Sequence, residues 1–193
     1  MVHLLEEIEN YAKKEDVPIM QKDGIEFLEK FIKENDIKNI LEIGTAIGYS
    51  AIKMALVDKD ISITTIERDE QRYNEAIKNV KKFNLENQIS LIYGDALEVD
   101  VNGSYDLIFI DAAKAQSIKF FEKYEPYLKK GKYIITDNLD FHGLVDSNEE
   151  MSRNLRQLVR KIKNYIEYLK ENKDYETTFY NVGDGVSVSK KRW

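Results

Sequence analysis

The sequence predicts an α/β fold in which a mostly parallel sheet of seven strands is covered by helices on both faces. Five apolar runs between residues 39 and 136 are separated by segments with helical periodicity. A pair of glycines follows the first run, and two further runs near the end of the chain are joined by a short Gly183-Asp184 link. Near-continuous apolar runs are typical of parallel strands buried on both faces, whereas a short glycine link favours an antiparallel hairpin.

Hydrophobic periodicity places the individual elements. We expect strands over residues 39–43, 61–66, 89–93, 105–110, 133–136, 176–182 and 185–189, and helices over 49–56, 69–83, 115–128 and 149–170. Residues 1–35 contain two short amphipathic segments separated by residues 16–21, and the second has apolar residues at helical spacing. We therefore expect residues 1–35 to form a helical lid or packing layer on a single domain that spans residues 1–193.

Composition and charge exclude several classes of protein. The chain has 193 residues, a net charge of -6, no cysteine and two histidines. Without cysteine it has no disulfide, thiolate zinc site or cysteine nucleophile. The acidic balance restricts any nucleic-acid binding to a local basic patch. No apolar stretch approaches the roughly 20 residues that span a bilayer, and the acidic first residues do not resemble an export signal. We expect a cytoplasmic protein that is not attached to a membrane.

Gly44 and Gly48 lie between the first predicted strand and the helix that begins at Tyr49. A strand, a glycine turn and a helix can open a βαβ unit, in which the backbone comes close to a bound nucleotide. Glu67 follows the second strand, about 20 residues beyond the turn, where a carboxylate can bind ribose hydroxyls. The pattern G-x-x-x-G fits a plain tight turn equally well, so other residues must decide between these interpretations.

Polar residues or glycine follow each of the first five predicted strands. They are Gly44, Glu67, Asp95, Asp111 and the pair Asp137-Asn138. Each acidic residue alone is typical of a helix N-cap or a turn. Because the carboxyl ends of parallel strands meet at one edge of a sheet, where ligands bind in open α/β folds, we expect these residues to converge on one crevice.

The last two of these strand ends predict a metal site made of oxygen ligands. Asp111, Asp137 and Asn138 suit Mg²⁺, or by the same logic Ca²⁺ or Mn²⁺. Lys114 lies three residues after Asp111, where the next helix would begin close to the metal. A solvated lysine at a helix end is the alternative interpretation of Lys114.

Several short motifs occur in an order and at a spacing typical of a known family. They are Leu-Glu-Ile-Gly-Thr-Ala-Ile-Gly-Tyr-Ser from Leu41, Ile-Glu-Arg-Asp from Ile66, Tyr-Gly-Asp-Ala from Tyr93, Phe-Ile-Asp-Ala-Ala-Lys from Phe109 and Thr-Asp-Asn-Leu from Thr136. Nearly the whole chain resembles the cation-dependent class I O-methyltransferases, the group that contains catechol and caffeoyl-CoA methyltransferases. Within this group, residues 109–116 and 137–145 most resemble the bacterial tRNA 5-hydroxyuridine methyltransferases.

The resemblance implies a Rossmann-like class I methyltransferase sheet, S-adenosylmethionine as the methyl donor, a divalent cation and a homodimer. Carried over by position, the donor contacts would be Met20 from the N-terminal segment, Glu42, Gly44 and Ser50 at the methionine end, Glu67 at the ribose, Asp95 and Ala96 at the adenine, and Asp111 beside the donor. The donor pocket would thus draw on the N-terminal segment and four strand ends.

The same resemblance implies the reacting groups. Asp111, Asp137 and Asn138 would be the metal ligands, and Lys114 matches the family's candidate base. Some small-molecule members have histidine directly after the metal aspartate, where this chain has Ala112. This departure favours an acceptor other than catechol. A metal bound to the acceptor hydroxyl would lower its pKa and orient it, and Lys114 would take the proton or only position the acceptor.

A basic stretch indicates what the acceptor could be. Arg153, Arg156, Arg160 and Lys163 recur on one side of the predicted helix over 149–170. They form either a solvated face or a strip that follows the phosphates of RNA beside the active site. The tRNA anticodon loop would present an unpaired base for stacking on Phe141 or a tyrosine. The residues from Lys190 to Arg192 would add positive charge.

Three other functions remain open from the sequence. A small-molecule methyltransferase would act on catechol-like or other vicinal hydroxyls. A nicotinamide-dependent oxidoreductase would share the glycine turn and Glu67, but the turn lacks the full G-x-G-x-x-G, and Asp137-Asn138 would have no purpose. A non-catalytic nucleotide-binding or RNA-binding module would bind the donor without depending on a metal.

Overall fold

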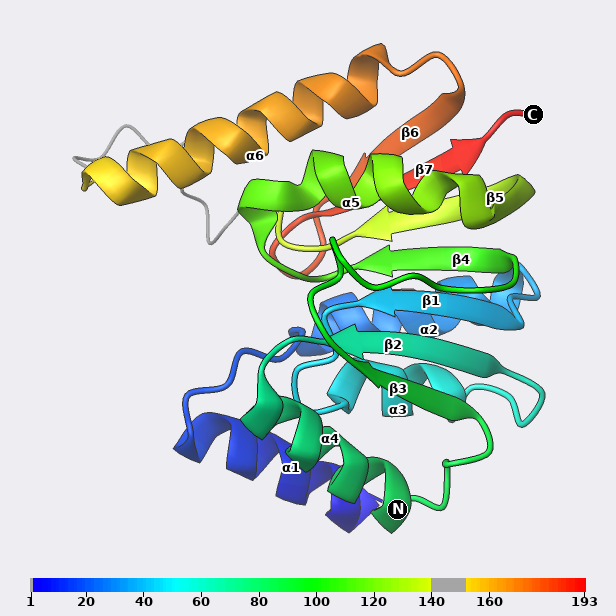
Figure 1. Ribbon diagram of the computed structural model, residues 1–193, viewed down its shortest axis with the longest axis vertical. Coiled ribbons are helices and arrows are strands. Elements are labelled where there is room, and N and C mark those ends of the chain that lie inside the picture. The colour runs from blue at the N-terminus through cyan, green and yellow to red at the C-terminus, as the bar shows by residue number, and fades with distance from the viewer. Residues whose placement is uncertain (1, 140–151) are drawn as a thin grey trace.

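The centre of the fold is a seven-stranded sheet (Figure 1). The computed structural model describes residues 2–139 and 152–193. Its strands are β1 (Asn39–Ile43), β2 (Ser62–Glu67), β3 (Ile89–Tyr93), β4 (Tyr105–Ile110), β5 (Leu128–Thr136), β6 (Tyr175–Tyr180) and β7 (Val186–Lys191). They lie in the order β3-β2-β1-β4-β5-β7-β6, in which β1 to β5 are parallel and β7 is antiparallel to β5 and β6. The predicted α/β fold, with a mostly parallel sheet and a C-terminal antiparallel hairpin, is confirmed.

Helices cover both faces of the sheet, as the sequence predicts. They are α1 (Val2–Lys14), α2 (Lys22–Glu34), α3 (Tyr49–Ala55), α4 (Glu70–Lys82), α5 (Ser117–Tyr124) and α6 (Arg153–Glu171). Two short 3-10 helices, η1 (Lys114–Gln116) and η2 (Glu125–Tyr127), flank α5. In Figure 1, α2 and α3 lie behind the sheet and α5 lies in front of it. The helices α1 and α2 match the two amphipathic segments expected within residues 1–35.

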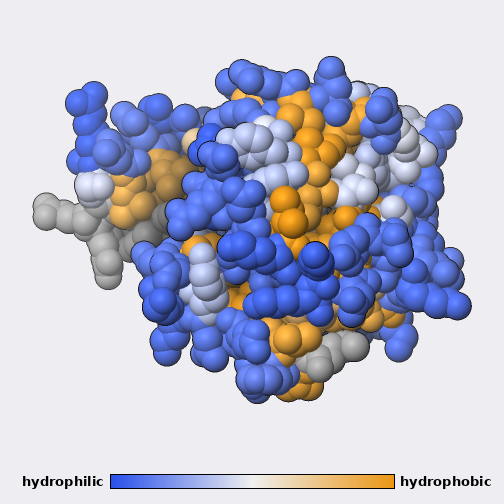
Figure 2. Space-filling view, turned by 60° about the horizontal axis from the view of Figure 1, so that its bottom comes forward, coloured by the Kyte–Doolittle hydropathy of each residue, from blue (hydrophilic) through white to orange (hydrophobic). Residues whose placement is uncertain are grey.

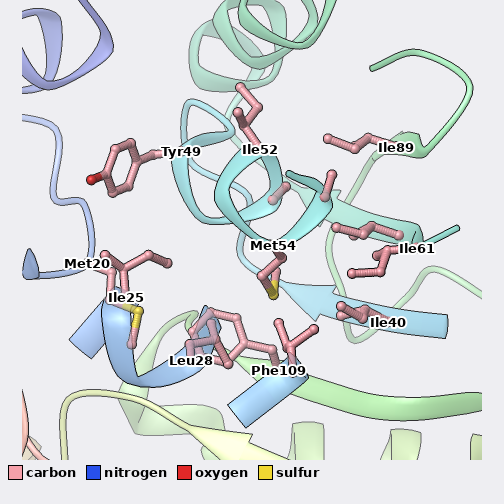
Figure 3. Close-up of a cluster of buried hydrophobic side chains, with 14 of the residues drawn as sticks. Met20, Ile25, Leu28, Ile40, Tyr49, Ile52, Met54, Ile61, Ile89 and Phe109 are labelled. Atoms are coloured by element: carbon pink, nitrogen blue, oxygen red, sulfur yellow. The ribbon is translucent and has the colours of Figure 1, made fainter. Parts of the chain in front are cut away.

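Strand β4 contributes to two hydrophobic cores, one on each face of the sheet. All six of its residues are buried. Because successive side chains of a strand point to opposite faces, Leu107 and Phe109 belong to the core formed with α1 to α4. Ile108 and Ile110 belong to the core formed with α5 and α6. Figure 3 shows the first core, in which Met54 of α3 points toward Phe109. Burial of apolar surface on both faces is the main term that stabilises the sheet.

The segment before β5 differs from the prediction. The single predicted helix is replaced by η1, α5 and η2, and β5 begins at Leu128 rather than at Tyr133. Pro126, in the first turn of η2, lacks the N–H that would continue α5. Residues 129–132 are polar and include Gly131, so their sequence suggests a loop, yet the strand continues through them with an irregularity in its pairing with β4.

The C-terminal elements also shift by a few residues. The predicted Gly183-Asp184 link is the middle of a longer loop over residues 181–185, because Tyr180 of β6 pairs with Val186 of β7. α6 begins after Ser152, whose side chain accepts a hydrogen bond from the backbone N–H of Leu155 at 3.3 Å. The predicted start of this helix at residue 149 lies outside the described residues.

The surface seen in Figure 2 is mostly hydrophilic, and its hydrophobic residues form separated patches. Across residues 2–139 and 152–193, no helix combines the length and the apolar character that crossing a bilayer requires.

Candidate active site

The ends of the five parallel strands are joined to one another by backbone hydrogen bonds. These bonds run from Gly44 N to Ile66 O (3.1 Å), from Gly94 N to Glu67 O (2.9 Å), from Asp111 N to Ile43 O (2.9 Å) and from Asp137 N to Ile110 O (3.2 Å). The residues that follow β1, β3, β4 and β5 are therefore each held directly beside a neighbouring strand. This ladder fixes the polar residues of the sequence motifs along one edge of the sheet.

A pocket of about 540 Å³ opens at this edge. Nine of the residues singled out from the sequence line it: Met20, Gly44, Ser50, Glu67, Asp95, Ala96, Asp111, Lys114 and Asn138. Glu42 and Asp137 do not line the pocket, and their side chains are buried behind it. A cavity of this volume is within the range of small-molecule and cofactor sites.

Gly44 is required where β1 approaches β4. Its φ is +100°, in the region that side chains rarely adopt, and a Cβ there would lie 2.4 Å from the backbone oxygen of Asp111. Gly48, at φ +87°, precedes the first residue of α3. The turn thus allows the backbones of two strand ends to touch at the floor of the pocket.

Glu67 is held over this turn by backbone donors. Its Oε2 accepts a hydrogen bond from Ala46 N at 2.7 Å, and its Oε1 accepts one from Asp69 N at 2.8 Å. Asp95 is fixed in the same way, because its Oδ1 accepts from Leu97 N at 2.8 Å. Each carboxylate oxygen has a second lone pair, so both residues can still accept hydrogen bonds from the hydroxyl or amino groups of a ligand.

Glu42 acts through its neighbours rather than at the pocket surface. Its fully buried carboxyl accepts hydrogen bonds from the hydroxyls of Ser50 and Thr65, and Thr65 is hydrogen-bonded to Thr45. Burial raises the pKa of Glu42 to about 7, although the two hydroxyl donors oppose this shift. Ser50 and Thr45 line the pocket, so Glu42 orients two of its polar groups from behind.

The predicted metal ligands lie together at the other end of the pocket. The side-chain amide of Asn138 donates to Asp111 Oδ1 at 3.2 Å and to Asp137 Oδ2 at 2.8 Å. Lys114 Nζ lies 2.9 Å from Asp111 Oδ1. Asn138 has a φ of +63°, which asparagine tolerates better than most residues. The structure therefore brings all four residues into direct contact.

This group has the chemistry of a cation site. Asp137 Oδ1 is buried and has no hydrogen-bond partner among the described residues. Burial and, next, the Asp111 carboxylate raise the pKa of Asp137 to about 7 in total, although Lys114 opposes the shift. Rotation of the Asn138 amide would present its oxygen in place of its N–H groups. The described residues contain no cluster of three or more His, Cys, Asp or Glu side chains for a metal. Two carboxylates and one amide oxygen still fit a hard cation that keeps several waters.

The pocket also contains residues that sequence reasoning did not single out. Arg68 and Arg72 line it near Glu67, and Tyr49 lines it from the start of α3. Asp184 reaches it from the loop between β6 and β7, and its charge contributes to the raised pKa of Asp137. The Gly-Asp-Gly sequence around Asp184 was a signal, but by itself it indicates only a turn.

The predicted basic strip lies on α6 and outside the pocket. The side chains of Arg153, Arg156, Arg160 and Lys163 are exposed, and none of them lines the pocket. α6 packs against η1, which begins with Lys114. Figure 1 shows that α6 begins at the side of the sheet to which the parallel strands point. The basic strip therefore lies on α6, which packs against η1, and η1 carries the pocket residue Lys114.

The acceptor prediction also named Phe141 and the basic residues from Lys190 to Arg192. Lys190 pairs with Tyr133, at the amino end of the region where β5 pairs with β7. The basic residues from Lys190 to Arg192 therefore lie toward the edge of the sheet opposite the pocket, where Figure 1 marks the C-terminus. They do not extend the strip on α6. Phe141, the candidate for stacking on a base, lies outside the described residues.

Comparisons with known proteins agree with this arrangement. A model of the O-methyltransferase family matches residues 1–192. Tapetum-specific methyltransferase 1 of Arabidopsis thaliana is 29% identical, over 95% of this chain and 82% of its own length. The crystal structure of a proposed caffeoyl-CoA O-methyltransferase from Staphylococcus aureus is 44% identical, with a TM-score of 0.92 over 97% of this chain and 91% of that one.

A further similar crystal structure contains a bound ligand. The O-methyltransferase from Bacillus cereus was solved in complex with S-adenosylhomocysteine; it is 25% identical, with a TM-score of 0.85 over 98% of this chain and 91% of that chain. The chain therefore belongs to the O-methyltransferase family and is an S-adenosylmethionine-dependent O-methyltransferase of the class I caffeoyl-CoA and catechol type.

Proposed function

We propose that the protein uses a divalent cation, Mg²⁺ in the first instance, to transfer the methyl group to a hydroxyl of 5-hydroxyuridine at the wobble position of tRNA. The observation that carries the metal dependence is the buried, unpaired Oδ1 of Asp137 beside Asp111 and Asn138. A buried carboxylate oxygen without a donor is unfavourable, and a cation would satisfy it.

The donor would occupy the half of the pocket around the glycine turn. We assign its ribose hydroxyls to Glu67, its adenine to Asp95 and Ala96, and its methionine end to Gly44 and Ser50. The support is that all five line one pocket and that backbone donors already orient both carboxylates. Met20 lines the same pocket from the segment between α1 and α2.

The acceptor would lie between the donor and the residues Asp111, Asp137 and Asn138, which would hold the cation. When bound, the cation would supply a positive charge that lowers the pKa of the acceptor hydroxyl and orients it. The hydroxyl oxygen then bonds to the methyl carbon, the bond from that carbon to the sulfonium sulfur breaks, and S-adenosylhomocysteine leaves as a neutral sulfide. Lys114, 2.9 Å from Asp111, takes the hydroxyl proton in its uncharged form, or it positions the oxygen while the proton passes to water.

The RNA acceptor is supported by the exposed basic strip on α6, which packs against η1 and so lies near Lys114. Within residues 2–139 and 152–193, no carboxylate forms an ion pair with any of its four residues. A second candidate is a small-molecule hydroxyl acceptor. It is favoured by the similarity to the proposed caffeoyl-CoA enzyme of Staphylococcus aureus.

The two acceptors are separated by one experiment. The protein is incubated with labelled S-adenosylmethionine, Mg²⁺ and either tRNA bearing 5-hydroxyuridine or catechol, and the products are identified by mass spectrometry. We expect label in 5-methoxyuridine, loss of transfer on chelation, and weaker transfer at raised salt or in the double variant Arg156→Glu, Arg160→Glu. Label in catechol alone would support the second candidate.

The metal dependence has its own control. Asp137→Ala should abolish metal-stimulated transfer and largely retain binding of S-adenosylhomocysteine, because Asp137 does not line the pocket. Equal activity of the unmodified protein with and without chelator would refute the cation.

A further inference from the structure

Asp23 joins two parts of the chain that lie far apart in sequence. Its Oδ2 accepts a hydrogen bond from the backbone N–H of Gly183 at 2.9 Å, and its Oδ1 accepts one from the N–H of Gly24 at 3.0 Å. One carboxylate therefore bridges the first turn of α2 and the loop between β6 and β7. Although Asp23 is exposed, its pKa is lowered, chiefly by the hydrogen bond from Gly183.

The two glycines bring the backbones themselves into contact. Gly183 has a φ of +54°, which side chains rarely adopt, and a Cβ on it would lie 3.4 Å from Gly24 Cα, an ordinary van der Waals contact. A Cβ on Gly24 would lie 3.1 Å from Cε of Met20. A side chain on Gly24 would therefore displace the end of the Met20 side chain, and a side chain on Gly183 would strain the backbone there. The contact is close because neither residue has a side chain.

Each side of this contact carries part of the pocket wall. Residues 18–21, which include Met20, directly precede α2 and line the pocket. On the other side, Asp184 follows Gly183 directly, lines the pocket and acts electrostatically on Asp137. Figure 3 shows Met20 beside Ile25 of α2, so the wall and the helix pack as one unit.

We propose that Asp23 is a positioning residue that fixes the N-terminal wall of the donor pocket against the loop carrying Asp184. Donor binding and the geometry next to Asp137 are then linked through one exposed carboxylate that touches neither the donor nor the cation. This inference rests on the proposed function in one respect, namely that residues 18–21 contact the donor. Any acidic residue in the first turn of a helix also interacts favourably with the helix dipole. That general effect would act on the stability of α2 and leave the loop unaffected.

The test compares three variants in the full chain. Asp23→Ala removes both hydrogen bonds, Asp23→Asn retains one acceptor oxygen, and Glu26→Ala is the matched control. Glu26 lies on the same helix, and its exposed side chain forms an ion pair with Lys22 at 3.9 Å. Calorimetry measures the affinity for S-adenosylhomocysteine. Hydrogen exchange measures the protection of the amides at residues 181–185, with and without this ligand.

We expect Asp23→Ala to weaken ligand binding by roughly 2- to 13-fold for each hydrogen bond that is lost. Asp23→Asn should have a smaller effect, and Glu26→Ala should bind as the unmodified protein does. Amide exchange at residues 181–185 should rise in Asp23→Ala, both with and without ligand. If Asp23→Ala proves unfolded, Asp23→Asn decides the matter by the same two measurements.

Two results would overturn the inference. One is unchanged affinity in a folded Asp23→Ala or Asp23→Asn variant, and the other is unchanged exchange at residues 181–185. Failure of the unmodified protein to bind S-adenosylhomocysteine is a different outcome, because it would refute the proposed donor site before any variant is compared.

Discussion

Replacement of Glu42 by glutamine should change how the stability of the protein depends on pH. The carboxyl of Glu42 is fully buried, and burial raises its pKa from 4.5 to about 7, with further contributions from Asp111 and Glu67. Glutamine has nearly the same shape and no charge. Its amide can donate to the hydroxyl of Thr65 while its oxygen accepts from Ser50, so both hydroxyls keep a partner.

The magnitude follows from the shift in pKa. Below pH 4.5 both the folded and the unfolded chain carry a proton on Glu42, and the residue adds no pH dependence. Between pH 4.5 and about 7 the folded chain keeps the proton that the unfolded chain has released, so the free energy of unfolding falls as pH rises. A difference of about 2.5 pKa units corresponds to about 3 kcal/mol. Above pH 7 the unmodified protein has lost this full amount of its free energy of unfolding, whereas Glu42→Gln has lost none of it.

Urea denaturation at pH 5, 6, 7 and 8 measures this difference. We expect the two proteins to have similar free energies of unfolding near pH 5 and the variant to be more stable by about 3 kcal/mol at pH 8. Glu176→Gln, which removes an exposed carboxylate from β6, controls for the change in net charge. Parallel pH profiles of the unmodified protein and Glu42→Gln would refute the reasoning, because the buried carboxyl would then not retain its proton.

Three further substitutions test the site and the core. Gly44→Ala would place a Cβ 2.4 Å from the backbone oxygen of Asp111 at a φ of +100°, so we expect a loss of stability of at least about 1–3 kcal/mol and weaker binding of S-adenosylhomocysteine in calorimetry; unchanged binding would contradict the close approach. Lys114→Met should slow methyl transfer by roughly 10²-fold or more in a single-turnover assay while retaining donor binding, and a normal rate would remove Lys114 from the reaction. Tyr165→Phe removes a buried hydroxyl that lies 2.8 Å from Thr136 Oγ1, which should lower the melting temperature by about 2–4 °C for a loss of about 1 kcal/mol; a higher melting temperature would show that this pair does not stabilise the core.

Much of the fold and the order of the site residues could be predicted from the sequence, because both depend on local patterns. The run from Tyr105 to Ile110 is apolar on both alternating sets of positions, apart from Asp106, and this identifies a strand buried on both faces. Gly44 has to be glycine because its backbone adopts a positive φ. Parallel strands carry their following residues to the same edge whatever the rest of the chain does. Glu67, Asp111 and Asn138 could therefore be assigned to one pocket.

Local patterns were insufficient where polar residues continue a strand or where a helix stops early. Residues 129–132 belong to β5 although their own side chains favour a loop and the register with β4 shifts across them. The helix that was predicted to continue beyond Tyr124 ends there because Pro126 lacks an N–H, and η2 follows. The strand continues despite its polar side chains, whereas the helix ends for a local reason, the missing N–H of Pro126.

Sequence alone determined that strands, glycine turn and acidic strand ends would form one ligand-binding edge, because each of these features is encoded by neighbours in the chain. Tertiary structure alone decided that Glu42 lies behind Ser50, that Asp137 keeps an unpaired buried oxygen, and that Asp23 meets Gly183. These facts depend on how deeply each residue is buried and on which residues distant in sequence contact it. Both are properties of the packed chain, since periodicity fixes the face on which a residue lies and leaves its partner on that face undetermined.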